Sequence, residues 1–264
     1  MSIATIVGIL AALGLFIGAV MISTDNPSAF LDLPSFIMVV GGCSTAMFVS
    51  YEPRYVILSL KLIVRIYGAP PITRDHLQAE VGRFIKWAAA VQKNGPVGLE
   101  KEIGDPSTLD PVLKFGSGMV IAGYEAQAVR NIMEEFVDNT FNRNMAPVNV
   151  MKDFAAGAPA FGMVGTLVGL IVMLGSMGGS PEDLGAGLAV AMLTTLYGVL
   201  FARVLFLPAA SKMQQREQIF KFRNGILVEG FALLADKKSP RFMQDALNAF
   251  LDPSIHYDID AAKE

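Results

Sequence analysis

Two threonines in apolar stretches are the residues whose type and spacing are suited to chemistry. Thr166 lies in the uncharged block 154–181 and Thr195 in the next one, 184–202. If the blocks are antiparallel helices, both hydroxyls lie about 16–18 Å from the same end at 1.5 Å per residue, whereas Thr194 points about 100° away. A hydroxyl oxygen can coordinate a cation or accept a hydrogen bond. Threonines in membrane helices also bond back to the i−4 carbonyl, and spacing alone favours this packing role.

Four uncharged apolar blocks must supply the helices that hold these hydroxyls. The blocks are residues 3–22, 33–51, 154–181 and 184–202, in a 264-residue chain that is 53% hydrophobic and only 17% charged. An ordinary soluble domain is about 25% charged, and about 20 apolar residues span a membrane as a helix. The sequence therefore predicts four transmembrane helices. The last continues to about Leu207 and includes Arg203, whose long stem can reach the interface.

The first block also has to be compared with a signal peptide. A cleaved signal needs a basic leading segment, a shorter apolar core and a small-residue cleavage site. Only Met1 and Ser2 precede the block. An uncleaved first transmembrane helix is therefore the favoured interpretation.

The distribution of charge sets the expected orientation. The connections 23–32 and 181–183 contain Asp or Glu but no Lys or Arg, whereas every basic residue except Arg203 falls within 52–153 or 210–264. Short loops rich in Lys and Arg stay in the cytoplasm. Both chain ends are therefore expected inside, with two short acidic loops outside.

The resulting plan is an all-α membrane protein with four transmembrane helices, a helical cytoplasmic domain and a helical cytoplasmic tail. Apolar spacing and breakers predict inner-segment helices over 55–67, 75–93, 111–121 and 125–142. The predicted segments are 1–51 with the first two transmembrane helices, 52–153 as the cytoplasmic domain, 154–209 with the last two, and 210–264 as the tail.

The remaining residues give no indication of an enzyme, a metal centre or a tightly bound cofactor. Cys43 is the single cysteine and the two histidines are far apart, which excludes a cysteine-rich metal site. The glycine-rich stretch 175–187 lacks the ending of a phosphate loop, and Glu134-Glu135 is typical of a solvated helix face. A net charge of −3 gives no indication of nucleic-acid binding.

The four apolar blocks contain no ionisable residue near mid-membrane depth. Ion-driven membrane proteins usually place one there, to bind and release the ion. The chain alone is therefore a poor transporter, and an ion-carrying carboxylate must come from a second subunit.

The third block contains small residues at a spacing that lets another helix backbone approach closely, which indicates packing within the chain or in an oligomer. These are Gly162, Gly165 and Gly169. Pro159 and Pro208 lie near the cytoplasmic ends of the third and fourth blocks. Proline there marks either a helix end or a hinge.

Long ordered motifs run through the last two blocks. They are Gly157–Leu170 (GAPAFGMVGTLVGL), Ala191–Gly198 (AMLTTLYG) and Phe206-Leu207-Pro208. With Gly41-Gly42 in the second block, they closely resemble the MotA/PomA family of flagellar stator subunits, over nearly the whole chain. The related TolQ/ExbB energisers of envelope transport share the proton-channel logic of the last two helices and remain the alternative, but they have one helix fewer, so the N-terminal pair of helices favours the flagellar branch.

The resemblance implies a homo-pentamer in the bacterial inner membrane around two copies of a MotB/PomB-type partner. The partner's membrane aspartate would carry the ion while the pentamer pushes on the rotor. It implies ion-path roles for Thr166, Thr194 and Thr195, and matches Pro159 and Pro208 to the paired prolines of the family. A structural membrane oligomer without an ion path is the third hypothesis.

In the inner segment, the resemblance implies contact with a rotor switch protein of the FliG type. The stretch 99–106 matches the charged rotor-facing region, which assigns this role to Glu100 and Glu102. The basic position upstream is occupied by Gln92, and the resemblance therefore implies that Lys93 beside it is the basic rotor-contacting residue. Three residues before the first proline, Ala156 replaces an aspartate common in the family.

The transported ion is predicted to be sodium, with a proton as the alternative. The three threonines match the sodium-type pattern. A hydroxyl can serve as a ligand for a hard cation, whereas proton transfer needs only a carboxylate and water.

Overall fold

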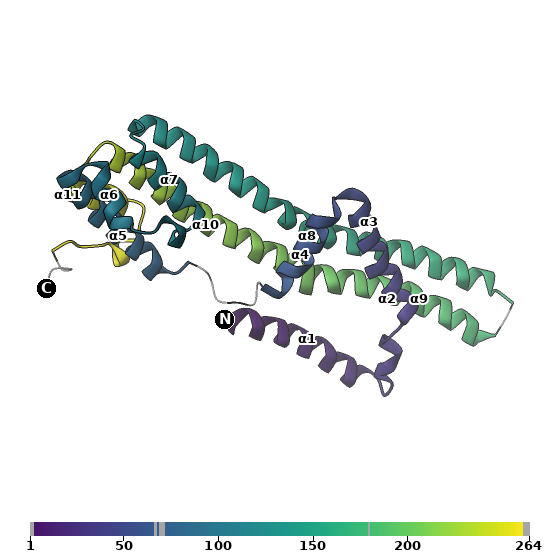
Figure 1. Ribbon diagram of the computed structural model, residues 1–264. Coiled ribbons are helices and arrows are strands. Elements are labelled where there is room, and N and C mark those ends of the chain that lie inside the picture. Colours follow the sequence, from purple (N-terminus) through teal and green to yellow (C-terminus); the bar gives the residue numbers. More distant parts are fainter. Residues whose placement is uncertain (1–2, 66–67, 69–71, 179, 261–264) are drawn as a thin grey trace. The chain divides into compact units, whose positions relative to one another are not determined.

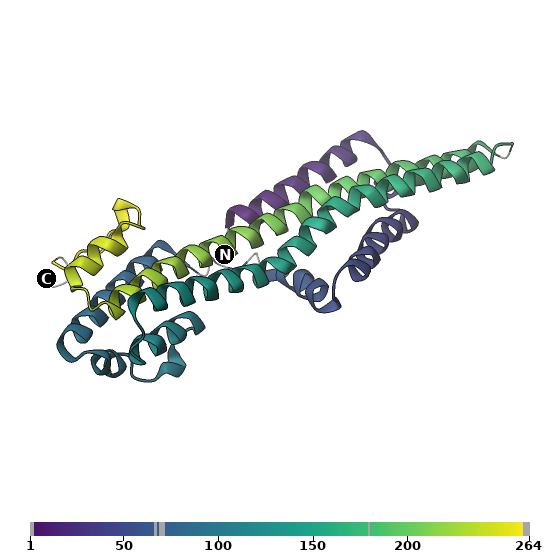
Figure 2. The same ribbon diagram turned by 90° about the horizontal axis from the view of Figure 1, so that it is seen from above.

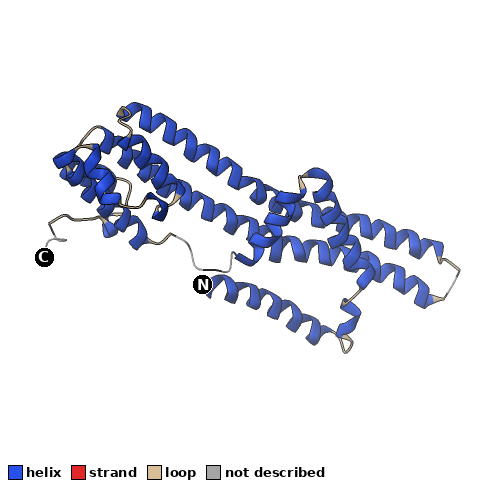
Figure 3. Ribbon diagram, viewed as in Figure 1, coloured by secondary structure: helices blue, strands red, loops and turns tan. Residues whose placement is uncertain are grey.

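The computed structural model describes residues 3–65, 68, 72–178 and 180–260, which are helical with no strand among them (Figures 1 and 3). The longer helices are α1 (Ile3–Ser23), α4 (Pro53–Arg65), α5 (Arg74–Asn94), α6 (Pro96–Ile103), α7 (Pro111–Ile121), α8 (Ala126–Gly175), α9 (Pro181–Leu200), α10 (Leu207–Ala235) and α11 (Pro240–Asn248). The second apolar block is α2 (Leu33–Phe36), the π-helical η2 (Ile37–Gly41) and α3 (Gly42–Ser50). Short 3₁₀ turns are η1 (Pro27–Phe30), η3 (Pro106–Thr108) and η5 (Pro253–Ile255), and η4 (Phe201–Phe206) is π-helical.

The helices expected in the inner segment are confirmed as α4, α5, α7 and the first part of α8, except that residues 66–67 of the first one lie outside the described residues. One expectation there was wrong. Residues 125–142 were predicted to form a helix separate from the third apolar block, but α8 continues without a break for 50 residues, past Pro147 and Pro159. Proline removes one hydrogen bond and bends a helix, and the turns on either side can still keep it continuous.

Among the described residues, three helical stretches are long and apolar enough to cross a membrane: Pro27–Ser50, Ala126–Gly175 and Pro181–Ala235. In the first block the apolar helix Leu10–Ser23 is shorter than a membrane crossing, although α1 as a whole has 21 residues. A fourth transmembrane helix and the direction of insertion therefore stay predictions.

The chain divides into two compact units. Unit 1 contains residues 1–69 and 144–215, and unit 2 contains residues 70–143 and 216–264. Unit 1 holds the apolar blocks. In both Figures 1 and 2 the second part of α8 and α9 lie side by side as a hairpin, and in the view of Figure 1 α2 and α3 run obliquely across it.

The core of unit 2 is built on aromatic side chains from α5 and α10. The ring centroid of Phe84 lies 4.9 Å from that of Phe231 and 5.3 Å from that of Trp87, edge to face in both pairs. All three residues are buried. Two glycines make room for them, because a Cβ at Gly116 would overlap Phe231 and one at Gly230 would overlap Phe84.

A buried ion network ties three helices of unit 2 together. The guanidinium of Arg223 on α10 donates hydrogen bonds to Glu80 on α5 and to Asp110, which caps α7. The side chains of Arg223 and Glu80 are only 12% and 10% exposed. Burial alone raises the pKa of the Asp110 carboxyl, but hydrogen bonds from Arg223 and from the first turn of α7, with the charge of Arg223, lower this pKa below its usual range. Asp110 therefore adds stability at neutral pH, and this stability is lost as the pH falls through the lowered pKa.

Replacing Arg223 with methionine should destabilise unit 2 by about 3 kcal/mol, because the half-buried Asp110 loses its ion pair and the buried Glu80 keeps only its pair with Arg83. Trp87, the single tryptophan, lies in this core, so its fluorescence follows the unfolding of this unit. The matched control is Arg241→Met, since the Arg241 ion pair with Asp260 is exposed. Equal unfolding midpoints for the two variants would contradict the structural role of Arg223.

Candidate functional site

The candidate site lies on the hairpin of α8 and α9 in unit 1, where two backbones meet at glycines. A Cβ at Gly169 would lie 2.6 Å from the Ala191 nitrogen, and one at Gly198 would lie 2.6 Å from the Ala158 oxygen. Gly162 faces the backbone of Thr194 and Thr195 in the same way. Only glycine fits these positions, so the hairpin packs at the distance that small residues allow.

This packing brings Thr166 and Thr195 into direct contact. Their Oγ1 atoms are 2.5 Å apart, and the Thr166 Oγ1 also lies 3.0 Å from the Ala191 oxygen and 3.1 Å from the Gly162 oxygen. Thr195 is exposed and Thr166 is half-buried. The depth match expected from the sequence is therefore confirmed as a contact between the two hydroxyls, at the surface of the hairpin.

After the two hydroxyls of this pair have donated their protons, the oxygen of the exposed Thr195 can still accept a hydrogen bond or bind a cation. Each hydroxyl has one proton and two lone pairs. If Thr166 donates to a carbonyl and accepts from Thr195, then the Thr195 oxygen keeps its lone pairs for an outside group. Two hydroxyls supply only part of the oxygen shell that a hard cation takes. The pair is therefore suited to assist an ion bound mainly by another group.

Thr194 is not brought to this pair. It is fully buried, its Oγ1 donates to the oxygens of Val190 and Ala191 at 3.0 Å each, and its side chain fills the space beside Gly165. The structure therefore places Thr194 in the helix contact, where its hydroxyl satisfies its own helix.

The two candidate prolines differ in their surroundings. Pro159 lies inside α8 with its Cα against Gly198 of α9. Pro208 follows the π-helical turns of η4. The wider turns there tolerate the lack of a backbone N–H donor at the proline. Both positions therefore lie within continuous helices, so the alternative of a helix end is wrong for each.

Tyr197 is a residue that the sequence interpretation missed. Its hydroxyl donates to the Phe30 oxygen at 2.5 Å and accepts from the Asp32 amide at 3.0 Å. It thereby fixes the connection between α1 and α2 against α9. The only available signal was a tyrosine within an apolar block, since a buried phenol needs hydrogen-bond partners.

The predicted rotor-facing charges lie on the α5–α6 hairpin of unit 2. Lys93, Glu100 and Glu102 are all exposed. The helices turn at Gly95, which has a φ of 64°, and pack closely because a Cβ at Gly98 would overlap the Ala90 carbonyl.

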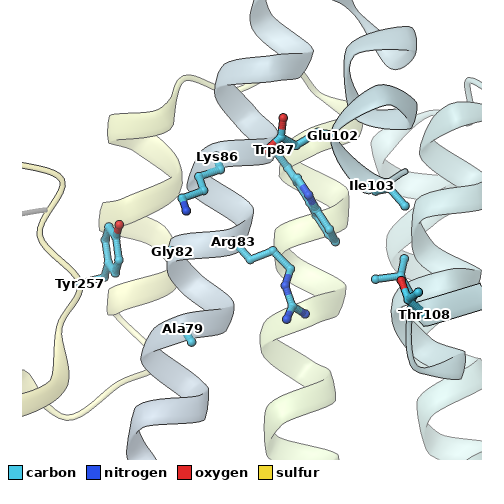
Figure 4. Close-up of a pocket in the computed structure, with 10 residues that line it drawn as sticks. Ala79, Gly82, Arg83, Lys86, Trp87, Glu102, Ile103, Thr108 and Tyr257 are labelled. Carbon is cyan, nitrogen blue, oxygen red and sulfur yellow. The ribbon is translucent and has the colours of Figure 1, made fainter. Parts of the chain in front are cut away.

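A cavity of about 580 Å³ is lined by one of these charges, Glu102. Figure 4 shows Arg83 and Lys86 on α5, with Tyr257 on one side and Glu102 and Thr108 on the other. The spacing of Lys86 and Lys93, two helical turns apart on α5, was a signal for a basic face that the sequence interpretation did not use.

Comparisons with known proteins give consistent results. Residues 105–224 match the model of the MotA/TolQ/ExbB proton channel family. The uncharacterized protein YtxD of Bacillus subtilis is 32% identical over 84% of this chain and 79% of its own length. Chemotaxis protein PomA of Vibrio alginolyticus is 28% identical, with 96% of each chain covered. The fold is similar to that of a chain in the flagellar MotAB stator complex from Bacillus subtilis, with a TM-score of 0.82 at 23% identity over 100% of this chain and 98% of that one.

The glycine packing predicts that Gly169→Ala separates the two helices, because its Cβ would meet backbone rather than a mobile side chain. Overpacking of this kind costs about 1–3 kcal/mol. The measurement is disulfide formation between cysteines at positions 166 and 195, in a Cys43→Ser background, on oxidation in membranes. We expect a markedly lower yield with Gly169→Ala.

Gly185→Ala is the matched control, since a Cβ at Gly185 meets no atom within 4 Å. It should leave the disulfide yield unchanged. Equal yields for the two alanine variants would show that the glycines do not align the threonines.

Proposed function

The chain belongs to the MotA/PomA branch of the MotA/TolQ/ExbB proton channel family, and we propose that it is the A subunit of a flagellar stator. In this role it forms, with a MotB/PomB-type partner, an ion channel that converts an ion gradient into torque on the rotor. The relatives named for motility and chemotaxis match along almost their whole length, which supports this assignment.

The observation that carries the proposal is the Thr166–Thr195 pair on an exposed face of the α8–α9 hairpin. Residues 154–175 and 184–202, described in the structure, contain no acid. An ion passing this face therefore needs a carboxylate from another chain. We assign the first ligand to the partner's membrane helix and an assisting role to the two hydroxyls.

We assign sodium as the driving ion, with the proton as the alternative outcome. A pair of hydroxyl oxygens is useful to a metal cation, which takes several oxygen ligands at once. A proton needs one carboxylate and a chain of water. Thr194 contributes indirectly, by holding the hairpin closed beside Gly165.

The prolines are proposed as flexible points of the two helices during rotation. Pro159 removes one backbone hydrogen bond from α8. The π-helical turns before Pro208 interrupt the regular backbone hydrogen bonding where α10 begins. The two prolines match the paired prolines of the family. They would let the ends of the hairpin bend when the ion binds or leaves.

The rotor contact is assigned to the α5–α6 hairpin, with Lys93, Glu100 and Glu102 as its charges. All are exposed and contribute little to stability there. Charges of this kind steer and orient a partner. Lys86, which is exposed and lines the neighbouring cavity, extends the basic surface and compensates for Gln92, the uncharged residue at the expected basic position. Arg83 lines the same cavity but is paired with Glu80.

The assembly is proposed to be a homo-pentamer around two partner chains in the bacterial inner membrane, with both termini in the cytoplasm. The placement of Lys and Arg within 52–153 and 210–264 supports this orientation. On the hairpin, large apolar side chains such as Met163, Leu167 and Ile171 are more than 60% exposed. This face therefore has room for the partner helix and neighbouring copies.

Thr195→Val keeps the shape of the side chain and removes the exposed hydroxyl, so it should reduce ion influx and swimming speed by about tenfold or more, the worth of one hydrogen bond. Thr195→Ser should retain most of both. Thr194→Val is the matched control at the neighbouring position, and it should have a much smaller effect because its hydroxyl bonds only to its own helix.

Glu100→Lys should stop rotation while ion influx continues, because it changes only the rotor-facing surface. The two readouts are swimming of a stator-deleted host that expresses this chain with its partner, and ion uptake by the same cells. Loss of influx in Glu100→Lys, or normal influx in Thr195→Val, would contradict the division of roles between the two units.

A further inference from the structure

Arg203 is a charge within an apolar helical stretch that the proposed function does not use. It lies in η4, inside the candidate membrane-crossing stretch Pro181–Ala235. The residue is exposed, and none of the hydrogen bonds or ion pairs found among the described residues involves its guanidinium. A charged side chain at membrane depth is costly and is usually paired.

Arg203 shares one face of the hairpin with the threonine pair. The exposed residues along this face are Thr195, Val199, Arg203 and Leu207, each four positions after the last. In an ordinary α-helix steps of four drift around the axis. The π-helical turns of η4 have more residues per turn, so they keep Arg203 closer to the line of Thr195.

The direction of the side chain favours the threonine side. Cα–Cβ bonds in a helix tilt toward its N-terminus, which for Arg203 is the direction of Val199 and Thr195. Arg203 lies eight positions after Thr195, about 12 Å along the helix. The first bond of the side chain therefore tilts away from the basic residues that begin at Lys212.

We propose that Arg203 is the resident counter-charge for a carboxylate that a partner's membrane helix places against the Thr166–Thr195 face. The apolar parts of this chain described on the hairpin supply no acid, so charge complementarity requires one from outside. The inference rests on the proposed function, which seats a partner helix on this face.

The pairing defines two states of the site. Without a bound cation, Arg203 holds the partner's carboxylate ionised. When a cation binds the carboxylate and the threonine oxygens, it competes with the positive charge of Arg203. The arginine therefore weakens cation binding and favours release, which makes it a residue that sets the apparent ion affinity.

Arg203→Asn removes the charge and leaves a polar side chain. It should lower the half-saturating concentration of the driving ion, measured as swimming speed against sodium and separately against pH, by about tenfold, as expected for a unit charge about 12 Å away at an effective dielectric constant near 20. The maximal speed should fall because release slows. Half-saturation unchanged from the native chain would overturn the proposal.

Moving the charge along the helix distinguishes a partner carboxylate from a lipid headgroup as the group that Arg203 contacts. The double variant Arg203→Ala with Leu207→Arg moves the arginine one turn toward the basic end, at another exposed position of the same face. If Arg203 serves the path, the double variant should behave like Arg203→Asn. If Arg203 instead contacts a lipid phosphate, the double variant should behave like the native chain, and the proposal is wrong. If Arg203 instead pairs with an acid of a second copy such as Asp32, then Asp32→Asn should behave like Arg203→Asn, and the proposal is again wrong.

Proximity can be tested without any motility readout. In a Cys43→Ser background, Arg203→Cys is paired with single cysteines along the partner's membrane helix, and disulfides are formed in membranes of cells that express both chains. We expect cross-linking to peak within one turn of the partner's membrane carboxylate. No cross-link there overturns the inference even if the native chain drives rotation, whereas a native chain without motility counts against the proposed function alone.

Discussion

The close approach of α8 and α9 is the constraint on which the candidate site depends. Glycines at 162, 169 and 198 let backbone meet backbone, and this distance is what allows two short threonine side chains to touch across the helices. A larger residue at any of these positions would move the two helices apart and break the contact between the hydroxyls. Packing of small residues in a membrane environment therefore sets the geometry of the polar pair.

The same hairpin is the reason for proposing that the chain works with a partner. Its apolar surface positions two hydroxyls but carries no acid in residues 154–175 or 184–202, and the proposed function therefore takes the strongest ion ligand from another chain. Arg203, on the same face, adds a fixed positive charge. The division is physically sensible, because a carboxylate on one helix and its counter-charge on another allow relative movement to change ion affinity.

Much of the site was predictable from the sequence, for reasons that particular residues show. Helical rise and antiparallel blocks predicted that Thr166 and Thr195 lie at one depth, and the structure confirms their contact. The inward position of Thr194 depends on space beside Gly165, and the anchoring role of Tyr197 depends on a partner 167 positions away. The continuity of α8 past Pro147 depends on tertiary packing, which overrides local breaker signals. The ion network of Arg223, Glu80 and Asp110 likewise joins distant segments that no local pattern relates.

The most direct test of the account is the swimming of a stator-deleted host that depends on this chain and its partner, with sodium varied at fixed pH and the proton gradient collapsed separately by an uncoupler. The account predicts speed that follows sodium, survives the uncoupler and is lost in Thr166→Val. Speed that is indifferent to sodium but lost with the uncoupler would contradict the sodium assignment and return the threonines to packing. Motility that does not require this chain would contradict the stator function itself.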